Sequence, residues 1–257
     1  MSEREAREPA HLYPGCLASY VYPEIGLAAG RLLEAAGMAP RLVRGQGCCG
    51  MPALGMLDLE GARRMASDTV RLLSGLAGPI VTVCPTCSVA LRQEYPRLLA
   101  EDELAGPARA VAARTQELSE LLAARGFAPQ PVSGAEAMTV AYHESCHLKR
   151  SLGVTEAPRR LLAAAGYRLA EVPEADRCCG FAGTYAVRME PVSMRILERK
   201  MACLASVQPG VIATDCPGCL LQLSRGRERF GVAAPVRHTA VLLAGKPGRK
   251  ELRLGAW

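Results

Sequence analysis

The sequence predicts an α/β protein built from two pseudo-symmetric tandem domains, each a small parallel sheet flanked by helices. Three observations lead to this fold class. The cysteine pattern of the first half of the chain repeats in the second half, short apolar segments alternate with longer amphipathic ones, and cysteines follow the short segments. Short apolar strands separated by helices are typical of parallel sheets, which place functional residues at the carboxyl ends of their strands.

The internal repeat accounts for ten of the eleven cysteines. Each half contains a single cysteine, an adjacent cysteine pair followed by glycine, and a closing Cys-x-x-Cys motif. The first set is Cys16, Cys48, Cys49, Cys84 and Cys87, and the second set is Cys146, Cys178, Cys179, Cys216 and Cys219. The offset between the sets is 130 residues for the first three positions and 132 for the last two. This duplication predicts two cysteine-rich domains, at residues 1–130 and 131–257, joined by a linker within residues 126–137.

Apolar periodicity and glycine or proline boundaries predict the secondary structure of both halves. We expect strands at residues 12–13, 41–43, 79–83 and 140–142, and helices at residues 23–36, 57–76, 88–99, 108–125, 191–206, 220–225 and 240–244. In this arrangement Cys16, Cys84 and Cys146 each follow a strand.

The adjacent cysteine pairs have a local geometry that suits metal binding. The Cα atoms of Cys48–Cys49, and of Cys178–Cys179, are roughly 3.8 Å apart, which is shorter than the roughly 4.4 to 6.8 Å of a relaxed disulfide. Both thiols of a pair can face one centre only if the backbone turns. Gly50 and Gly180 permit the positive φ that such a turn needs.

The two Cys-x-x-Cys motifs predict helix starts. Proline is favoured in the first turn of a helix, so helices should begin at Pro85 and Pro217, with Cys84 and Cys216 as capping residues. The positive end of the helix dipole would then stabilise nearby thiolates.

The composition excludes several classes of protein. Eleven cysteines in 257 residues, with a charged segment instead of an apolar core at the amino terminus, indicate metal or redox chemistry in a reducing compartment, so we expect a cytoplasmic protein. No apolar run approaches the length of a transmembrane helix. Basic residues are scattered despite a net charge of +6, so no nucleic-acid partner is expected. The basic segment 245–257, which ends in Trp257, is a candidate for peripheral contact with the inner face of the cytoplasmic membrane, although a solvated tail is the simpler interpretation.

Three kinds of chemistry remain open on spacing alone. Five cysteines per half exceed the four that a tetrahedral zinc ion uses, although zinc with one spare thiol fits, at one site or both. Iron–sulfur clusters are also held by cysteine thiolates. A thioredoxin-like thiol pair would explain each Cys-x-x-Cys motif, but neither the adjacent pair nor the duplication. The spacing therefore favours iron–sulfur clusters over zinc, and zinc over thiol redox chemistry.

The order Cys, Cys-Cys-Gly and Cys-x-x-Cys, present twice, resembles the cysteine-rich (CCG) domain family. This family includes the cysteine-rich subunit of heterodisulfide reductase, lactate-utilisation proteins, and the iron–sulfur subunits of glycolate oxidase and anaerobic glycerol-3-phosphate dehydrogenase. The segments at residues 13–16, 90–96 and 179–185 look most like the respiratory dehydrogenase members. The resemblance covers nearly the whole chain.

The resemblance implies cofactors, partners and a function. The ten repeated cysteines would hold two clusters, one per set, which in the heterodisulfide reductase relatives are noncubane 4Fe–4S clusters. The leading hypothesis is an iron–sulfur electron-transfer subunit of a multisubunit oxidoreductase, passing electrons between a flavoprotein dehydrogenase or ferredoxin-like iron–sulfur subunit and a quinone or disulfide acceptor. The alternatives are a catalytic subunit of the heterodisulfide reductase type, which cleaves a disulfide at its clusters, and a zinc-stabilised assembly protein.

His147 is the candidate catalytic residue. It follows Cys146, where the first half has Leu17, so it can donate to sulfur or carry a proton to a reduced disulfide. His143 is close as well. A histidine satisfied by the backbone explains His147 equally well. Cys203 lies outside the repeat and is expected to be a buried structural cysteine.

Overall fold

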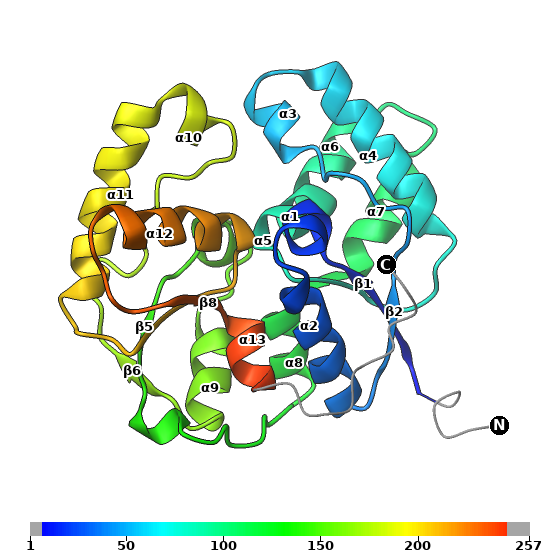
Figure 1. The fold of residues 1–257 in the computed structure, drawn as a ribbon. Coiled ribbons are helices and arrows are strands. Elements are labelled where there is room, and N and C mark those ends of the chain that lie inside the picture. Colours follow the sequence, from blue (N-terminus) through cyan, green and yellow to red (C-terminus); the bar gives the residue numbers. More distant parts are fainter. Residues whose placement is uncertain (1–6, 246–257) are drawn as a thin grey trace. The chain divides into compact units, whose positions relative to one another are not determined.

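A computed structural model describes residues 7–245 (Figure 1). Residues 7–127 form one compact unit, and Ala128–Gly245 form another. Each unit contains a four-stranded, entirely parallel sheet flanked by helices. The predicted α/β fold class is therefore confirmed.

The first unit has the strand order β2-β1-β3-β4. Its strands are β1 (Pro9–Tyr13), β2 (Ala39–Leu42), β3 (Ile80–Thr82) and β4 (Thr115–Glu117), and its helices are α1 (Gly15–Tyr20), α2 (Pro23–Ala35), α3 (Met51–Gly55), α4 (Leu59–Ser74), α5 (Pro85–Val89), α6 (Tyr95–Leu98), α7 (Ala105–Arg114) and α8 (Leu118–Ala124). A π-helical turn at Ala90–Glu94 joins α5 to α6. The chain passes from β1 to β2 on one side and then to β3 on the other. The carboxyl ends of β1 and β3 therefore form a topological switch point.

The second unit repeats this order as β6-β5-β7-β8. Its strands are β5 (Thr139–Tyr142), β6 (Arg168–Ala170), β7 (Val211–Thr214) and β8 (Val236–His238), and its helices are α9 (Glu156–Ala164), α10 (Tyr185–Arg188), α11 (Glu190–Ala205), α12 (Pro217–Arg229) and α13 (Thr239–Ala244). A 3-10 turn at Ala135–Ala137 precedes β5, and a π-helical turn at His147–Ser151 follows it. The equivalent switch point lies between the carboxyl ends of β5 and β7.

Apolar faces attach the helices to the sheets. In the first unit α2 buries Ile25, Leu32 and Leu33, which the 3.6-residue period places on one side of the helix, and all three residues of β3 are buried. Each large apolar side chain that is fully buried contributes roughly 1.5–3 kcal/mol. This face is therefore the main attachment of α2.

The single helix predicted at residues 108–125 is wrong. The segment forms α7, then β4, which pairs in parallel with β3, and then α8. Arg114, at the end of α7, donates to the carbonyl oxygens of Leu76 and Gly78 at 2.5 and 3.0 Å. Glu117 then begins α8 with a capping box. Strand pairing and these side-chain contacts override the high helix propensity of the surrounding alanines and leucines.

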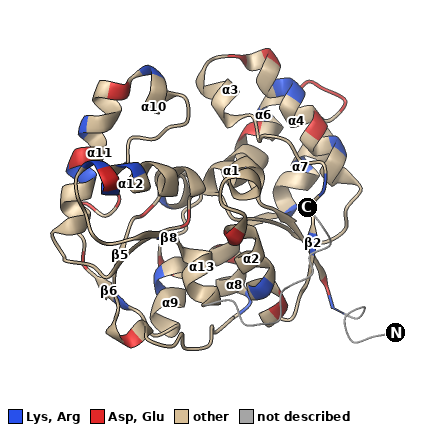
Figure 2. Cartoon of the chain, in the orientation of Figure 1, with Lys and Arg blue, Asp and Glu red and all other residues tan. Residues whose placement is uncertain are grey.

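Helix α12 continues through Gly226, where the predicted helix stopped. A Cβ atom at this position would lie 2.7 Å from Met201 Cγ and 2.9 Å from Leu197 Cδ1 of α11. The missing side chain permits this close packing, which offsets the low helix propensity of glycine. An ion pair between Arg225 and Glu190 also joins the two helices. Figure 2 shows basic and acidic residues interspersed along this part of the chain.

None of the helices described within residues 7–245 is long and apolar enough to cross a membrane. The segment predicted to contact a membrane, or to be a solvated tail, lies outside the described residues from residue 246 onward.

Replacing Gly226 by alanine should weaken the packing of α12 on α11. Because the added methyl group would overlap two buried side chains, we expect a loss of about 1–3 kcal/mol in the free energy of unfolding, measured by urea denaturation. Gly75→Ala is the matched control, since Gly75 has a φ of −77° and no neighbouring atom within 4 Å of the added methyl group. Equal stability of the Gly226 variant and the unchanged protein would contradict this account of the helix packing.

Candidate metal centres

The repeated cysteines lie beyond the carboxyl ends of the strands in both units. Cys16 follows β1 and Cys84 follows β3, whereas Cys146 follows β5 and Cys216 follows β7. These strands flank the two switch points. The topology therefore brings the cysteines of each set to one edge of their sheet.

The adjacent cysteine pairs sit on turns that only glycine can complete. Gly50 and Gly180 have φ of 80° and 84°, as predicted. A Cβ atom at position 180 would lie 2.7 Å from the carbonyl oxygen of Ser193. The Gly180 amide donates to Cys178 Sγ at 3.3 Å, and the Ser193 hydroxyl donates to the Gly180 carbonyl at 2.8 Å. The turn thus also supplies a donor to sulfur.

The five thiols of each set are hydrogen-bonded neighbours in one order. In the first set the order is Cys16, Cys48, Cys49, Cys87 and Cys84, and in the second it is Cys146, Cys178, Cys179, Cys219 and Cys216. None of the ten is in a disulfide. The structure therefore brings the predicted residues of each set together. Their role as metal ligands stays a prediction.

One sulfur–sulfur distance is informative. The Sγ atoms of Cys179 and Cys219 are 3.5 Å apart. This is far longer than a disulfide bond of about 2.0 Å. It is close to the separation of about 3.8 Å between two thiolates on one tetrahedral metal ion with bonds of about 2.3 Å. The pair is spaced as ligands of one centre would be.

The thiols of each set differ in acidity. Hydrogen bonds from two neighbouring thiols lower the pKa of Cys48 and of Cys178 to about 2. The hydrogen bond to Cys48 raises the pKa of Cys49 to about 12, and the hydrogen bond to Cys178 raises the pKa of Cys179 to about 12. Ionising the neighbouring thiols of a set together therefore requires a nearby positive charge. A bound metal supplies such a charge.

A helix begins directly after a cysteine of each set. Cys84 and Cys216 occupy the N-cap positions of α5 and α12, and Pro85 and Pro217 lie in the first turns. This confirms the predicted helix starts. Because α12 has 13 residues, its dipole places partial positive charge beside the second set.

A buried carboxylate holds the loop that carries Cys146. Glu144 accepts a hydrogen bond from Lys149 Nζ at 2.6 Å and from two nitrogens of Arg159 at 2.8 and 3.1 Å. These charge-assisted bonds fix the chain just before the cysteine.

A buried lysine holds the loop that leads to Cys178. Lys200, on α11, is fully buried and donates to the carbonyl oxygens of Glu174 and Ala175 at 2.9 and 2.7 Å. Burial lowers the pKa of Lys200 to about 8. The two carbonyl groups nevertheless give its ammonium group direct partners.

Polar contacts also fix the chain before Cys216. The carboxylate of Asp215 accepts a hydrogen bond from the hydroxyl of Tyr142, and burial raises the pKa of Asp215 to about 6. His238 Nδ1 accepts from the Ala240 amide at 3.1 Å, so its Nε2–H donates to the Asp215 carbonyl at 2.8 Å. These hydrogen bonds hold the loop that leads to Cys216.

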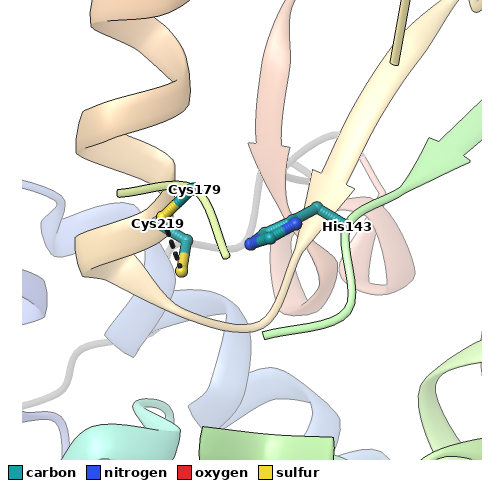
Figure 3. Close-up of side chains that lie close together, drawn as sticks. All are labelled: His143, Cys179 and Cys219. Atoms are coloured by element: carbon teal, nitrogen blue, oxygen red, sulfur yellow. Dashed lines mark hydrogen bonds between the residues drawn. The ribbon is translucent and has the colours of Figure 1, made fainter. Parts of the chain in front are cut away.

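His143 lies next to the second set. It directly follows β5 and is fully buried, and one of its ring nitrogens and the sulfur atoms of Cys179 and Cys219 all lie within 4.8 Å of one another (Figure 3). Neither ring nitrogen has a hydrogen-bond partner among residues 7–245, although buried polar groups are almost always paired. Burial, together with the charge of Lys200, lowers the pKa of His143 to about 3. A neutral imidazole and neighbouring thiols are a donor set that fits a metal centre.

The first unit has a tyrosine at the equivalent position. Tyr13 lies 130 residues before His143, at the carboxyl end of β1. Its hydroxyl donates to the Gly47 carbonyl at 3.3 Å, and Tyr95 donates to the Cys49 carbonyl at 3.1 Å. The two sets therefore have the same thiols but different buried neighbours.

Two sequence expectations outside the repeat have different outcomes. Cys203 is only partly buried on α11, with its sulfur 3.7 Å from Glu174 Oε2, so the prediction of a buried cysteine is wrong. His147 begins the π-helical turn after Cys146 and is partly buried. Its catalytic role stays a prediction. The histidine beside Cys179 and Cys219 is His143. Its position directly after a predicted strand is the sequence signal that could have identified it.

Comparison with known proteins identifies the family. The family described as "Cysteine-rich domain" (CCG) matches residues 10–92 and 140–224, and each matched segment contains one complete cysteine set. The chain belongs to the cysteine-rich (CCG) domain family. The predicted resemblance is therefore confirmed, with two copies of the domain.

Curated relatives of this CCG protein share its length. Lactate utilization protein A of Geobacillus kaustophilus is 34% identical over 90% of this chain and 97% of its own. The protein of the same name from Shouchella clausii is 32% identical over 91% of this chain and 98% of its own. The crystal structure of a hypothetical protein from Helicobacter pylori has the same fold, with a TM-score of 0.63 over 95% of this chain at 9% identity. This chain spans 50% of that protein's chain.

Replacing the glycine of the second CCG motif should disturb the fold and the thiols together. Gly180→Ala combines an unfavourable positive φ with a backbone clash, so we expect a loss of about 1–3 kcal/mol of stability and less metal bound by the second CCG domain. Urea denaturation and metal analysis measure the two effects.

Gly231→Ala is the matched control for this variant. Gly231 also has a positive φ of 67°, but no neighbouring atom lies within 4 Å of an added Cβ. Its variant should lose only the backbone contribution, about 1 kcal/mol, and keep its metal. Full metal content in the Gly180 variant would show that the turn does not position the thiols.

Proposed function

We propose that this protein is an iron–sulfur electron-transfer subunit of a multisubunit oxidoreductase that oxidises lactate. The observation that carries the proposal is the pair of complete five-cysteine sets, in each of which every thiol contacts the next and none is in a disulfide. The relatives named lactate utilization protein A, similar over nearly their whole length, support the choice of substrate.

The ten repeated cysteines would hold two clusters, one per CCG domain. A bound cluster supplies reversible one-electron transfer. The chain's own residues set the surroundings. The amides of Gly50 and Gly180 donate to the first cysteine of each pair, and the second cysteine, Cys49 or Cys179, is buried away from water. Donors to sulfur and low exposure are the features by which a protein adjusts a cluster's reduction potential. The cluster type is proposed to be noncubane 4Fe–4S at both sites.

The partners follow from the chemistry that the two sets would supply. The two proposed clusters would use all ten repeated cysteines, so further cofactors would have to come from other subunits. A flavoprotein dehydrogenase subunit would remove electrons from the substrate, and a ferredoxin-like iron–sulfur subunit would pass them on. The acceptor would be a quinone or a disulfide. We place the complex in the cytoplasm.

Metal analysis tests the cofactor. Protein purified without oxygen should contain about eight iron and eight acid-labile sulfide per chain if each set holds a 4Fe–4S cluster. Cys179→Ser should remove about half of both and one of two spectroscopic signals. Cys203→Ser is the matched control, because Cys203 lies outside both sets, and it should change neither. Two zinc ions and no sulfide would refute the iron–sulfur assignment, and two surviving signals in the Cys179 variant would refute the two ligand sets.

Lactate dependence tests the substrate. In the complex purified with its partner subunits, anaerobic addition of lactate should reduce the clusters and bleach their visible absorption. Glycolate and glycerol 3-phosphate, the substrates of other CCG enzymes named above, are the controls. Bleaching by a control compound and not by lactate would refute the lactate assignment while leaving the electron-transfer role intact.

A further inference from the structure

His143 is the least satisfied polar side chain around the second cysteine set. It is completely buried, and both ring nitrogens lack a hydrogen-bond partner among the described residues. A buried polar group without a partner destabilises the folded state, because it has lost its hydrogen bonds to water. The fold therefore keeps an unpaired imidazole at the site, and a partner that is not protein would offset that cost.

The ring lies beside the sulfur atoms. Figure 3 shows His143 at the end of its strand, near Cys179 and Cys219, which come from a loop and from the first turn of α12. The three donor atoms lie within 4.8 Å of one another. Two thiolates and a neutral imidazole at such distances are a common ligand combination for zinc and iron. Each donor comes from a different segment of a rigid scaffold.

The first unit provides an internal comparison. Tyr13, at the position equivalent to His143, is also buried beside its set and is affected by the charges of Cys87 and Cys49. Those cysteines are the equivalents of Cys219 and Cys179. The hydroxyl of Tyr13 is already bonded to the Gly47 carbonyl, whereas the imidazole of His143 is bonded to nothing within residues 7–245. The same place in the fold therefore holds a hydrogen-bonded hydroxyl group in one unit and an imidazole without a hydrogen-bond partner among the described residues in the other.

We propose that His143 is a nitrogen ligand of the metal centre in the second CCG domain. This proposal rests on the proposed function in that it takes the second cysteine set to hold a metal. The second centre then has sulfur and nitrogen ligands, while the first has sulfur ligands only. Because an imidazole is neutral, an iron–sulfur centre in which it takes the place of one thiolate has a higher reduction potential than a centre with thiolate ligands only. The second centre should therefore be reduced before the first.

Nitrogen spectroscopy tests the ligand directly. In protein labelled with ¹⁵N-histidine and partially reduced without oxygen, pulsed electron paramagnetic resonance of the second centre should show the strong hyperfine coupling of a directly bonded nitrogen. The coupling should disappear in His143→Gln and persist in His147→Gln, the neighbouring histidine variant. A weak coupling only, as from a hydrogen bond or an intervening water, would overturn the proposal, as would loss of the coupling in the His147 variant alone.

Redox titration supplies a second measurement. His143→Cys should keep the second centre assembled and shift its midpoint potential to lower values, because a thiolate replaces a neutral ligand. Tyr13→Phe, the equivalent change in the first unit, should leave the second centre's potential unchanged. An unchanged potential in His143→Cys would contradict the proposal.

The assignment of the cofactor and the assignment of His143 as a ligand can be refuted separately. If metal analysis finds zinc and no sulfide, the iron–sulfur function fails, but X-ray absorption at the zinc edge still tests His143. The characteristic scattering of a bound imidazole should then be present in the unchanged protein and absent in His143→Gln. Iron and sulfide without nitrogen coupling would retain the function and reject the ligand.

Discussion

The electrostatic repulsion among clustered sulfur atoms is the constraint on which the rest of each unit depends. Hydrogen bonds from neighbouring thiols lower the pKa of Cys48 and of Cys178, whereas the pKa values of the other thiols in contact with them are raised. Ionising all five needs a compensating cation. The parallel sheet brings the thiols to one edge, the glycine turn aims the adjacent pair, and helix starts add partial positive charge. These features lower the free-energy cost of forming the thiolates, and the proposed metal centres would supply the remaining positive charge.

The two units place their cysteines in the same way but surround them with different buried residues. Around the first set the buried neighbours are tyrosines, whose hydroxyl groups are bonded to backbone carbonyls. Around the second they are an imidazole, a buried lysine and a carboxylate bonded to Tyr142. Duplication fixes the ligand positions, since the turn and the helix start tolerate little change. The residues behind the ligands are free to differ. Two iron–sulfur centres in these unequal surroundings would have unequal potentials, which would give electrons a preferred direction.

The sequence predicted the parts of the fold that depend on local chemistry. Cysteine spacing, the glycine after each pair and the proline after Cys84 and Cys216 impose their geometry within a few residues, so the turns and helix starts were correct. Strands β4, β6, β7 and β8 were missed. Three of them, β4, β6 and β8, are three residues long and contain polar side chains, and only pairing with β3, β5 or β7 makes them strands. Strand β7 is largely apolar and fully buried, and its place before Cys216 matches that of β3 before Cys84. The predicted end of α12 was wrong because the contact that accommodates Gly226 comes from another helix, α11. His147 drew attention as the direct neighbour of Cys146. Adjacency in sequence does not decide which side chain faces a site, whereas the end of a strand at the switch point does, and His143 occupies that end.

The order of contacts within each set bears on the number of metal atoms. Cys49 and Cys179 stand in the middle of their sets, each touching the first cysteine of its pair on one side and a cysteine of the Cys-x-x-Cys motif on the other. A single tetrahedral ion uses four ligands and would leave one thiol of this continuous chain without a metal. That thiol would remain partly buried among thiolates, with its pKa raised by their charges. A centre with several metal atoms removes the conflict, because a middle sulfur can bind one metal atom while its neighbours bind others. The continuity of five sulfur contacts, more than their number, is therefore the structural argument for a cluster over a mononuclear zinc ion.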